Sequence, residues 1–75
     1  MNLKLVVSER IQQGMYENRI EFMELKRRTS IDAQGLRKYV YGESLPSIPS
    51  LVKIASALKY STDYILGLTD QKEKK

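Results

Sequence analysis

Residues 30–67 of the 75-residue chain read SIDAQGLRKYVYGESLPSIPSLVKIASALKYSTDYILG, and this stretch decides the fold. Its first part contains Asp32, a residue type that caps helix N-termini, and Gly42, a residue type that favours the left-handed conformation found just after helices. Between these two residues, apolar side chains recur at helical spacing. The signals together predict a helix over residues 33–41 that begins directly after a tight turn.

Two more helices are predicted further along the same stretch. Ser47 can cap a helix over residues 48–58, where the apolar residues form one stripe. Ser61 or Thr62 can cap a short fifth helix that ends before Gly67. The connectors are only a few residues long, which favours a compact arrangement of the helices.

The N-terminal part of the chain predicts the first two helices. One covers residues 3–13, where apolar residues recur at i, i+4 and i+8, and Gly14 is expected just after its end. Asn18 is expected to cap a second helix over residues 20–28, which carries acidic residues early and basic residues late, as the helix dipole favours. With no strand or repeat predicted, the fold class is an all-α, compact five-helix bundle over residues 1–69.

The composition narrows the classes of function. The net charge is +4, with six basic and three acidic residues between Arg19 and Tyr41, which favours an anionic partner such as nucleic acid. The chain has no cysteine or histidine, so we expect no metal site, no cofactor and no catalytic pair, and therefore no enzyme. A pocket of useful volume is not expected at this size.

The ends of the chain carry no sign of a membrane segment. No apolar run approaches the roughly 20 residues that cross a bilayer, and the N-terminus does not have the pattern of a signal peptide. We therefore expect a cytoplasmic protein. Residues 70–75 are predicted to form a disordered basic tail.

The predicted helix over residues 33–41 has two different sides. One side gathers residues that suit a core: Ala33, Leu36, Tyr39 and Val40. The other gathers an amide, a guanidinium, an ammonium and a phenol: Gln34, Arg37, Lys38 and Tyr41. Such groups read base edges and phosphates in the major groove of DNA, and the alternative is an ordinary solvated helix face. A second short helix just before a tight turn favours the first interpretation.

The segment LKRRTSIDAQGLRKYVYGESLPSIPSLVKIASALKYSTDYILGLTD resembles the phage-repressor and Cro-type (XRE-like) helix-turn-helix family. The resemblance covers roughly residues 20–70. It is most specific in the C-terminal half, where the residues in register are Tyr39, Gly42, Pro46, Ser47, Leu51, Ile54, Ala55, Leu58, Ser61, Asp63, Leu66 and Gly67. It implies a bundle of the lambda-repressor-like DNA-binding domain type.

The resemblance also implies roles for individual residues. Base-reading positions are Ala33, Gln34, Arg37 and Lys38. Phosphate-contacting positions are Arg28, Asp32, Tyr41, Ser44 and Ser47. The dimer interface is expected at Tyr64, Ile65 and Leu68, although Tyr60 and Tyr64 can belong either to the core or to a self-association surface. The implied partner is double-stranded DNA, bound by a homodimer with no membrane involved.

Four residues depart from the family pattern. Lys26 occupies a position that usually holds a small alanine, and Ser30 occupies a turn position where glycine is usual. Gly35 replaces a polar residue inside a helix, either to make room near Lys26 or to bring the backbone close to a phosphate. Glu43 stands where a basic residue is common.

The most favoured function is therefore a sequence-specific DNA-binding transcriptional regulator of the repressor type, with the helix over residues 33–41 in the major groove. The alternative is a protein-binding module of the same fold, such as an antitoxin or an antagonist of another regulator. A further possibility is that the chain is the N-terminal module of a longer regulator.

Overall fold

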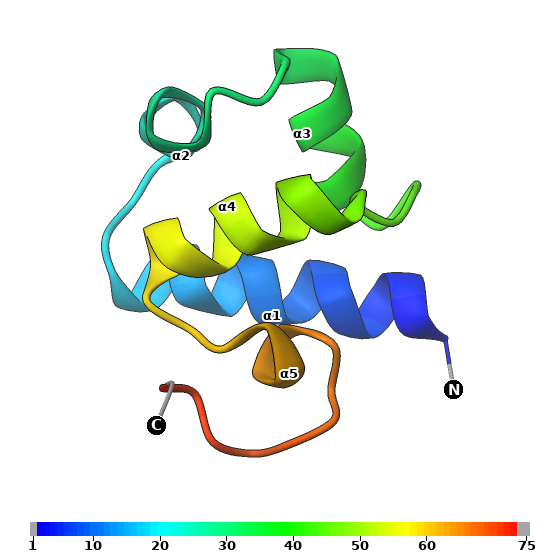
Figure 1. The fold of residues 1–75 in the computed structure, drawn as a ribbon. Helices are drawn as coiled ribbons and strands as arrows, with labels where there is room; N and C mark the ends of the chain where they lie inside the picture. Colours follow the sequence, from blue (N-terminus) through cyan, green and yellow to red (C-terminus); the bar gives the residue numbers. More distant parts are fainter. Residues whose placement is uncertain (1, 74–75) are drawn as a thin grey trace.

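The computed structural model describes residues 2–73, and their five helices are, in chain order, α1 (Leu3–Glu17), α2 (Phe22–Thr29), α3 (Ala33–Val40), α4 (Ile48–Leu58) and α5 (Thr62–Ile65). The described residues contain no strand, so the predicted all-α, five-helix fold is confirmed. α1 and α4 cross the middle of the molecule, α2 and α3 lie on one side of them, and α5 lies on the other (Figure 1). α1 contacts α3, α4 and α5, whereas α2 packs on α4.

Every helix contributes a fully buried side chain to one core. These side chains include Ile11, Leu25, Leu36, Ile54, Leu58 and Ile65. Tyr60 and Tyr64 are also buried and meet edge to face, with ring centroids 5.0 Å apart. The inward side of α3 is held by Leu36 and Val40, and this contact fixes which side of the helix remains outside.

The predicted caps of the last three helices are confirmed. Asp32 accepts hydrogen bonds from the backbone N–H groups at the start of α3. Ser47 accepts from the N–H of Ser50 at 3.3 Å, and Ser61 accepts from the N–H of Tyr64 at 3.0 Å. These three caps place the helices within one residue of their predicted bounds, because each gives the chain a unique starting point for helical hydrogen bonding.

The end of α1 differs from the prediction. The helix continues to Glu17, and Gly14 lies inside it instead of following it. A Cβ atom on Gly14 would lie 2.8 Å from Leu58 Cδ1 and 3.0 Å from Tyr60 Cε2. The glycine is therefore present because α4 and the following turn approach α1 closely, and not because a helix ends there.

The start of α2 also differs from the prediction. Asn18 closes α1, and its side-chain amide donates to the carbonyl oxygens of Gly14 at 2.8 Å and Leu58 at 3.0 Å. Arg19 then adopts a left-handed conformation with φ of 54°. α2 begins only at Phe22, so Asn18 is a C-terminal and not an N-terminal cap.

The segment after α5 returns along α1 and the start of α5. Ser61 Oγ donates to the carbonyl oxygen of Gln71 at 3.1 Å, and Lys72 Nζ lies 3.0 Å from a carboxylate oxygen of Glu17. Gln71 and Lys72, in the tail that the sequence predicts to be disordered, thus make specific contacts, while residues 74–75 of that tail lie outside the described part of the chain.

Candidate nucleic-acid interface

The turn between α2 and α3 is fixed by a buried threonine. Thr29 Oγ1 donates to the carbonyl oxygen of Leu25 at 2.8 Å and accepts from the N–H of Ile31 at 3.3 Å. Ser30, between them, adopts the left-handed conformation with φ of 57°, and its N–H donates to the carbonyl oxygen of Lys26. The positive φ expected from the sequence is confirmed, and the Thr29 hydrogen bonds hold this turn in place.

Asp32 acts as a cap at the start of α3. Its carboxylate accepts from the N–H groups of Gln34 at 3.1 Å and Gly35 at 3.4 Å. An ionised carboxylate only accepts hydrogen bonds, and a phosphate does the same at neutral pH. We therefore assign Asp32 to helix capping and not to the phosphate contact that the family resemblance implies.

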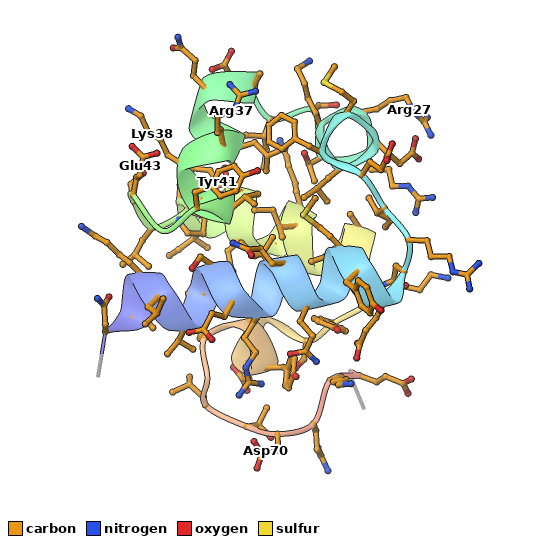
Figure 2. The ribbon with its side chains drawn as sticks, turned by 180° about the vertical axis from the view of Figure 1, so that it is seen from behind. Arg27, Arg37, Lys38, Tyr41, Glu43 and Asp70 are labelled. Carbon is orange, nitrogen blue, oxygen red and sulfur yellow. The ribbon has the colours of Figure 1, made fainter. Side chains whose placement is uncertain are left out.

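The outward side of α3 carries the polar row predicted from the sequence. Gln34, Arg37, Lys38 and Tyr41 are exposed, whereas Ala33 is half-buried. Arg37, Lys38 and Tyr41 project from α3 at one end of the molecule, far from Asp70 at the other end (Figure 2). Tyr39 is half-buried and packs against the core, as the sequence predicts for a residue behind this helix.

Arg37 is in contact with α2 through an aromatic ring. Its guanidinium carbon lies 5.0 Å from the centre of the Phe22 ring, which is a cation–π distance. Phe22 is the first residue of α2 and is itself half-buried against the core. No sequence pattern indicates this pairing, because the two residues are 15 positions apart and belong to different helices.

The basic residues at the end of α2 are paired with one acid. Arg27 Nε lies 3.2 Å and Arg28 Nε 2.7 Å from the carboxylate oxygens of Glu24. The hydrogen bond from Arg28, followed by that from Arg27, lowers the pKa of the Glu24 carboxyl. Both arginines remain exposed, so they keep donors that can reach a phosphate at the surface.

The connector after α3 uses its own backbone donors internally. The N–H groups of Glu43 and Ser44 both donate to the carbonyl oxygen of Lys38, at 2.8 and 3.4 Å. These two backbone N–H groups are therefore engaged within the chain and are not free for a phosphate. Ser47 lies at the exposed start of α4, where its hydroxyl also contacts that of Ser50 at 3.0 Å.

A side-chain methyl group would fit at Gly35 without a clash. A Cβ atom there would meet its nearest neighbours, the Tyr39 hydroxyl and Ile31 Cγ2, at the ordinary contact distances of 3.8 and 3.9 Å. No Lys26 atom is among the three nearest neighbours of this Cβ atom, so the structure lends no support to the explanation that Gly35 makes room for Lys26. The other explanation, close approach of a phosphate to the backbone, stays a prediction.

The residues predicted for a dimer interface fall into two groups. Tyr64 and Ile65 are buried inside the protomer, with exposed fractions of 5% and 0%. They cannot form a contact surface without unfolding α5, so this part of the prediction is corrected. Leu68 is 69% exposed and is free to meet a partner.

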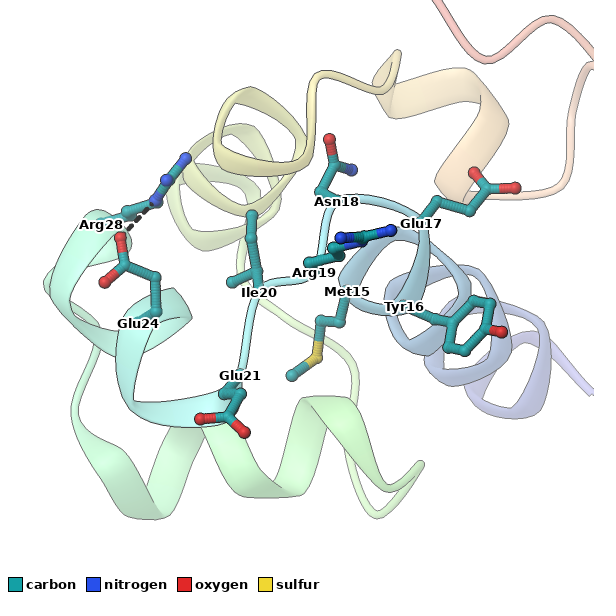
Figure 3. Close-up of a pocket in the computed structure, with 9 residues that line it drawn as sticks. All are labelled: Met15, Tyr16, Glu17, Asn18, Arg19, Ile20, Glu21, Glu24 and Arg28. Carbon is teal, nitrogen blue, oxygen red and sulfur yellow. Dashed lines mark hydrogen bonds and ion pairs between the residues drawn. The ribbon is translucent and has the colours of Figure 1, made fainter.

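An open hollow of about 920 Å³ lies between the end of α1 and the start of α2 (Figure 3). The hollow is open to solvent and is not an enclosed pocket. Its rim carries charged groups, including Arg19, Glu21 and the Glu24–Arg28 pair. Within the described residues there is no cluster of metal-binding side chains, and the hollow brings together no nucleophile–base pair.

The fold and its exposed polar helix define a helix-turn-helix domain of the lambda-repressor-like type. The helix-turn-helix family model HTH_3, of the Cro/C1 type, matches residues 24–65, which is more than half of the chain. The chain belongs to this family of DNA-binding regulators, which are generally not enzymes. No significant match was found among curated proteins or among solved structures. No helix in residues 2–73 is long and apolar enough to cross a membrane.

Proposed function

We propose that this chain is a sequence-specific, repressor-like transcriptional regulator that inserts α3 into the major groove of double-stranded DNA. The observation that supports this function is the division of α3 into a buried apolar side, with Leu36 and Val40, and an exposed row of donors and acceptors. A helix of this kind fits the major groove, where each base pair presents a distinct pattern of hydrogen-bonding groups.

The exposed row divides naturally into contact types. Gln34, Arg37 and Lys38 would read base edges, and the methyl group of Ala33 would meet a thymine methyl. Phosphates would be held by the flanking residues Arg28, Tyr41, Ser44 and Ser47. The base contacts would give sequence preference, and the phosphate contacts would fix the orientation of α3 in the groove.

The proposed function has a direct test. Duplexes selected from a random pool on the intact chain, and scrambled versions of them, would be titrated at two salt concentrations. We expect the selected duplex to bind at least about 10³-fold more tightly than the scrambled one at physiological salt. Both affinities should fall as salt rises, because basic side chains displace counterions from phosphates. A pool that shows no enrichment would contradict the proposal.

We also propose that the chain binds a two-fold operator as a homodimer, because one small domain buries too little surface for high affinity. Leu68 is the residue that supports the predicted location of the contact. Its side chain is 69% exposed, and it follows Gly67, which packs closely on Val6 of α1.

The Leu68→Asp substitution tests that contact. It should leave the fold intact, since the side chain is exposed, and should weaken binding to a two-site duplex far more than binding to a half-site duplex. Sedimentation of the free chain and of its DNA complex measures the stoichiometry. If the variant binds both duplexes as the wild type does, the dimer contact lies elsewhere.

A second candidate function is a protein-binding module of the same fold. Acidic Glu43 lies at the end of the polar row, and Arg27 and Arg28 are already paired with Glu24, which reduces the positive potential around α3. Under this alternative, binding to duplexes would be absent or insensitive to salt. The titration described above therefore separates the two candidates.

A further inference from the structure

We propose that Phe22 is a specificity-determining positioning residue, whose ring holds the Arg37 guanidinium in place for the reading of guanine. This inference rests on the proposed function and assigns a role to a residue of α2 that does not belong to the polar row of α3. The contact that carries it is the 5.0 Å distance between Arg37 Cζ and the centre of the Phe22 ring.

Arg37 differs from the other arginines of the helix-turn-helix. Arg27 and Arg28 donate to the carboxylate of Glu24, which occupies some of their N–H groups. Arg37 takes part in none of the ion pairs found within residues 2–73, and its contact is with a ring. A cation–π contact leaves the N–H donors of a guanidinium free, so the planar fork remains available for O6 and N7 of a guanine.

Phe22 is well placed to act as a fixed support. It is half-buried against the core and opens α2, so its ring is held by the scaffold while one side reaches Arg37. A long arginine side chain loses rotamer freedom when it binds a base, and a ring that restricts it beforehand reduces this loss. The support should therefore strengthen binding to the correct base more than binding to any duplex.

The test compares four variants with the wild type: Phe22→Leu, Phe22→Tyr, Arg37→Ala and the Phe22→Leu/Arg37→Ala double variant. Each is titrated with the selected duplex and with duplexes in which one guanine is replaced. We expect Phe22→Leu to lower discrimination at one guanine by about two- to fivefold, the range of an exposed cation–π contact. Phe22→Tyr, which keeps the ring, should retain discrimination, and Phe22→Leu should add nothing once Arg37 is alanine.

A spectroscopic measurement on the free protein accompanies the titrations. The side-chain protons of Arg37 should show an upfield ring-current shift in the wild type and in Phe22→Tyr, and this shift should disappear in Phe22→Leu. Circular dichroism confirms that each variant is folded. This signal shows whether the contact forms in solution, and the titrations show whether the contact sets base preference.

Three outcomes would overturn the inference. Phe22→Leu with unchanged discrimination would show that the ring does not set base preference. An equal loss in the Arg37→Ala background would show that Phe22 acts through packing alone. A uniform loss of affinity in Arg37→Ala would make Arg37 a phosphate contact. If the wild type selects no duplex, the proposed function fails as well, and a persisting ring-current shift would then leave the contact as a stabilising one only.

Discussion

Arg10 and Arg37 both lie over aromatic rings, but the surroundings of the two contacts differ. Arg10 Cζ lies 3.9 Å from the centre of the Tyr64 ring, and Arg10 Nη1 is buried without a hydrogen-bond partner among the described residues. Arg37 lies 5.0 Å from Phe22 and is exposed. A guanidinium over an aromatic ring therefore joins α1 to α5 at Arg10, whereas at Arg37 it leaves N–H donors exposed to solvent.

The side chains near Arg10 are joined by hydrogen bonds inside the chain. Gln13 Nε2 donates to the Tyr64 hydroxyl at 2.8 Å, and the Tyr60 hydroxyl donates to the carboxylate of Glu17. Polar groups that are satisfied within the chain have little left to offer a partner, whereas those on α3 do. We infer that residue type alone does not separate a structural arginine from a binding one, and that its neighbours do.

The largest expected effect comes from removal of Arg37. Arg37→Ala should weaken binding to the selected duplex by about 1–3 kcal/mol and relax base preference at one position. Its free energy of unfolding should fall by no more than about 1 kcal/mol, since the side chain is exposed and loses only its contact with Phe22. Arg28→Ala is the matched control, and we expect it to weaken binding evenly across sequences. If the two variants change affinity and base preference in the same way, Arg37 and Arg28 do not differ as base and phosphate contacts.

Removal of Arg10 is expected to lower stability and to leave DNA binding unchanged. Arg10→Ala should lower the free energy of unfolding by about 1–2 kcal/mol, because the contact with Tyr64 and the packing of the stem are both lost. Binding to DNA at temperatures where the variant is folded should be unchanged. Arg10→Met keeps the stem and isolates the charge. Thermal unfolding followed by circular dichroism measures both variants, and a binding defect in folded Arg10→Met would break the comparison.

Gly14 and Gly35 both lie inside helices, but alanine should change the stability in opposite directions at the two positions. Gly14→Ala should lower the free energy of unfolding by about 1–2 kcal/mol, because the new methyl group meets Leu58 and Tyr60. Gly35→Ala should raise it by up to about 1 kcal/mol, because a methyl group fits there without a clash and alanine favours the helix. Denaturant titration of each variant measures whether its free energy of unfolding rises or falls.

Gly35→Ala also tests the prediction about phosphate. If the backbone of α3 passes close to a phosphate, the stabilised variant should bind DNA less well than the wild type. Unchanged affinity would mean that Gly35 has no role at the interface.

The smallest expected effect is a loss of stability when the pH is lowered. The hydrogen bonds from Tyr60 and then Lys72 lower the pKa of the Glu17 carboxyl below its ordinary value of 4.5. A lowered pKa in the folded state contributes stability that is present above the ordinary value and is lost as the pH falls through the lowered one. The stability advantage of the wild type over Glu17→Gln should therefore shrink below about pH 4.5. Thermal unfolding at a series of pH values measures it, and an advantage that persists at the lowest pH would count against the Glu17 contacts.

Much of the fold was predictable because the decisive signals are local. Asp32, Ser47 and Ser61 cap their helices as predicted, and Gly42 takes the left-handed conformation, with φ of 78°, just after α3. The predicted end of α1 at Gly14 was wrong, since a glycine that follows a helix and a glycine that permits close packing cannot be distinguished in sequence. Only the position of α4 distinguishes them.

The candidate site was predictable in part for the same reason. The exposed row of α3 follows from helical periodicity, and the structure places Gln34, Arg37 and Lys38 outside as expected. α5 has four residues, too few for periodicity to tell the inner from the outer side, so the sequence did not decide between the core and a dimer contact for Tyr64, which the structure buries. Phe22 was missed because its partner belongs to another helix.

The segment held by Ser61 and Glu17 has a practical consequence for measurement. It lies below α5, at the end of the molecule away from α3 (Figure 1). The chain has no cysteine, and Gln71 is exposed with only its backbone atoms engaged. A single Gln71→Cys substitution would thus carry a dye or a surface linker at a point remote from the proposed groove contacts.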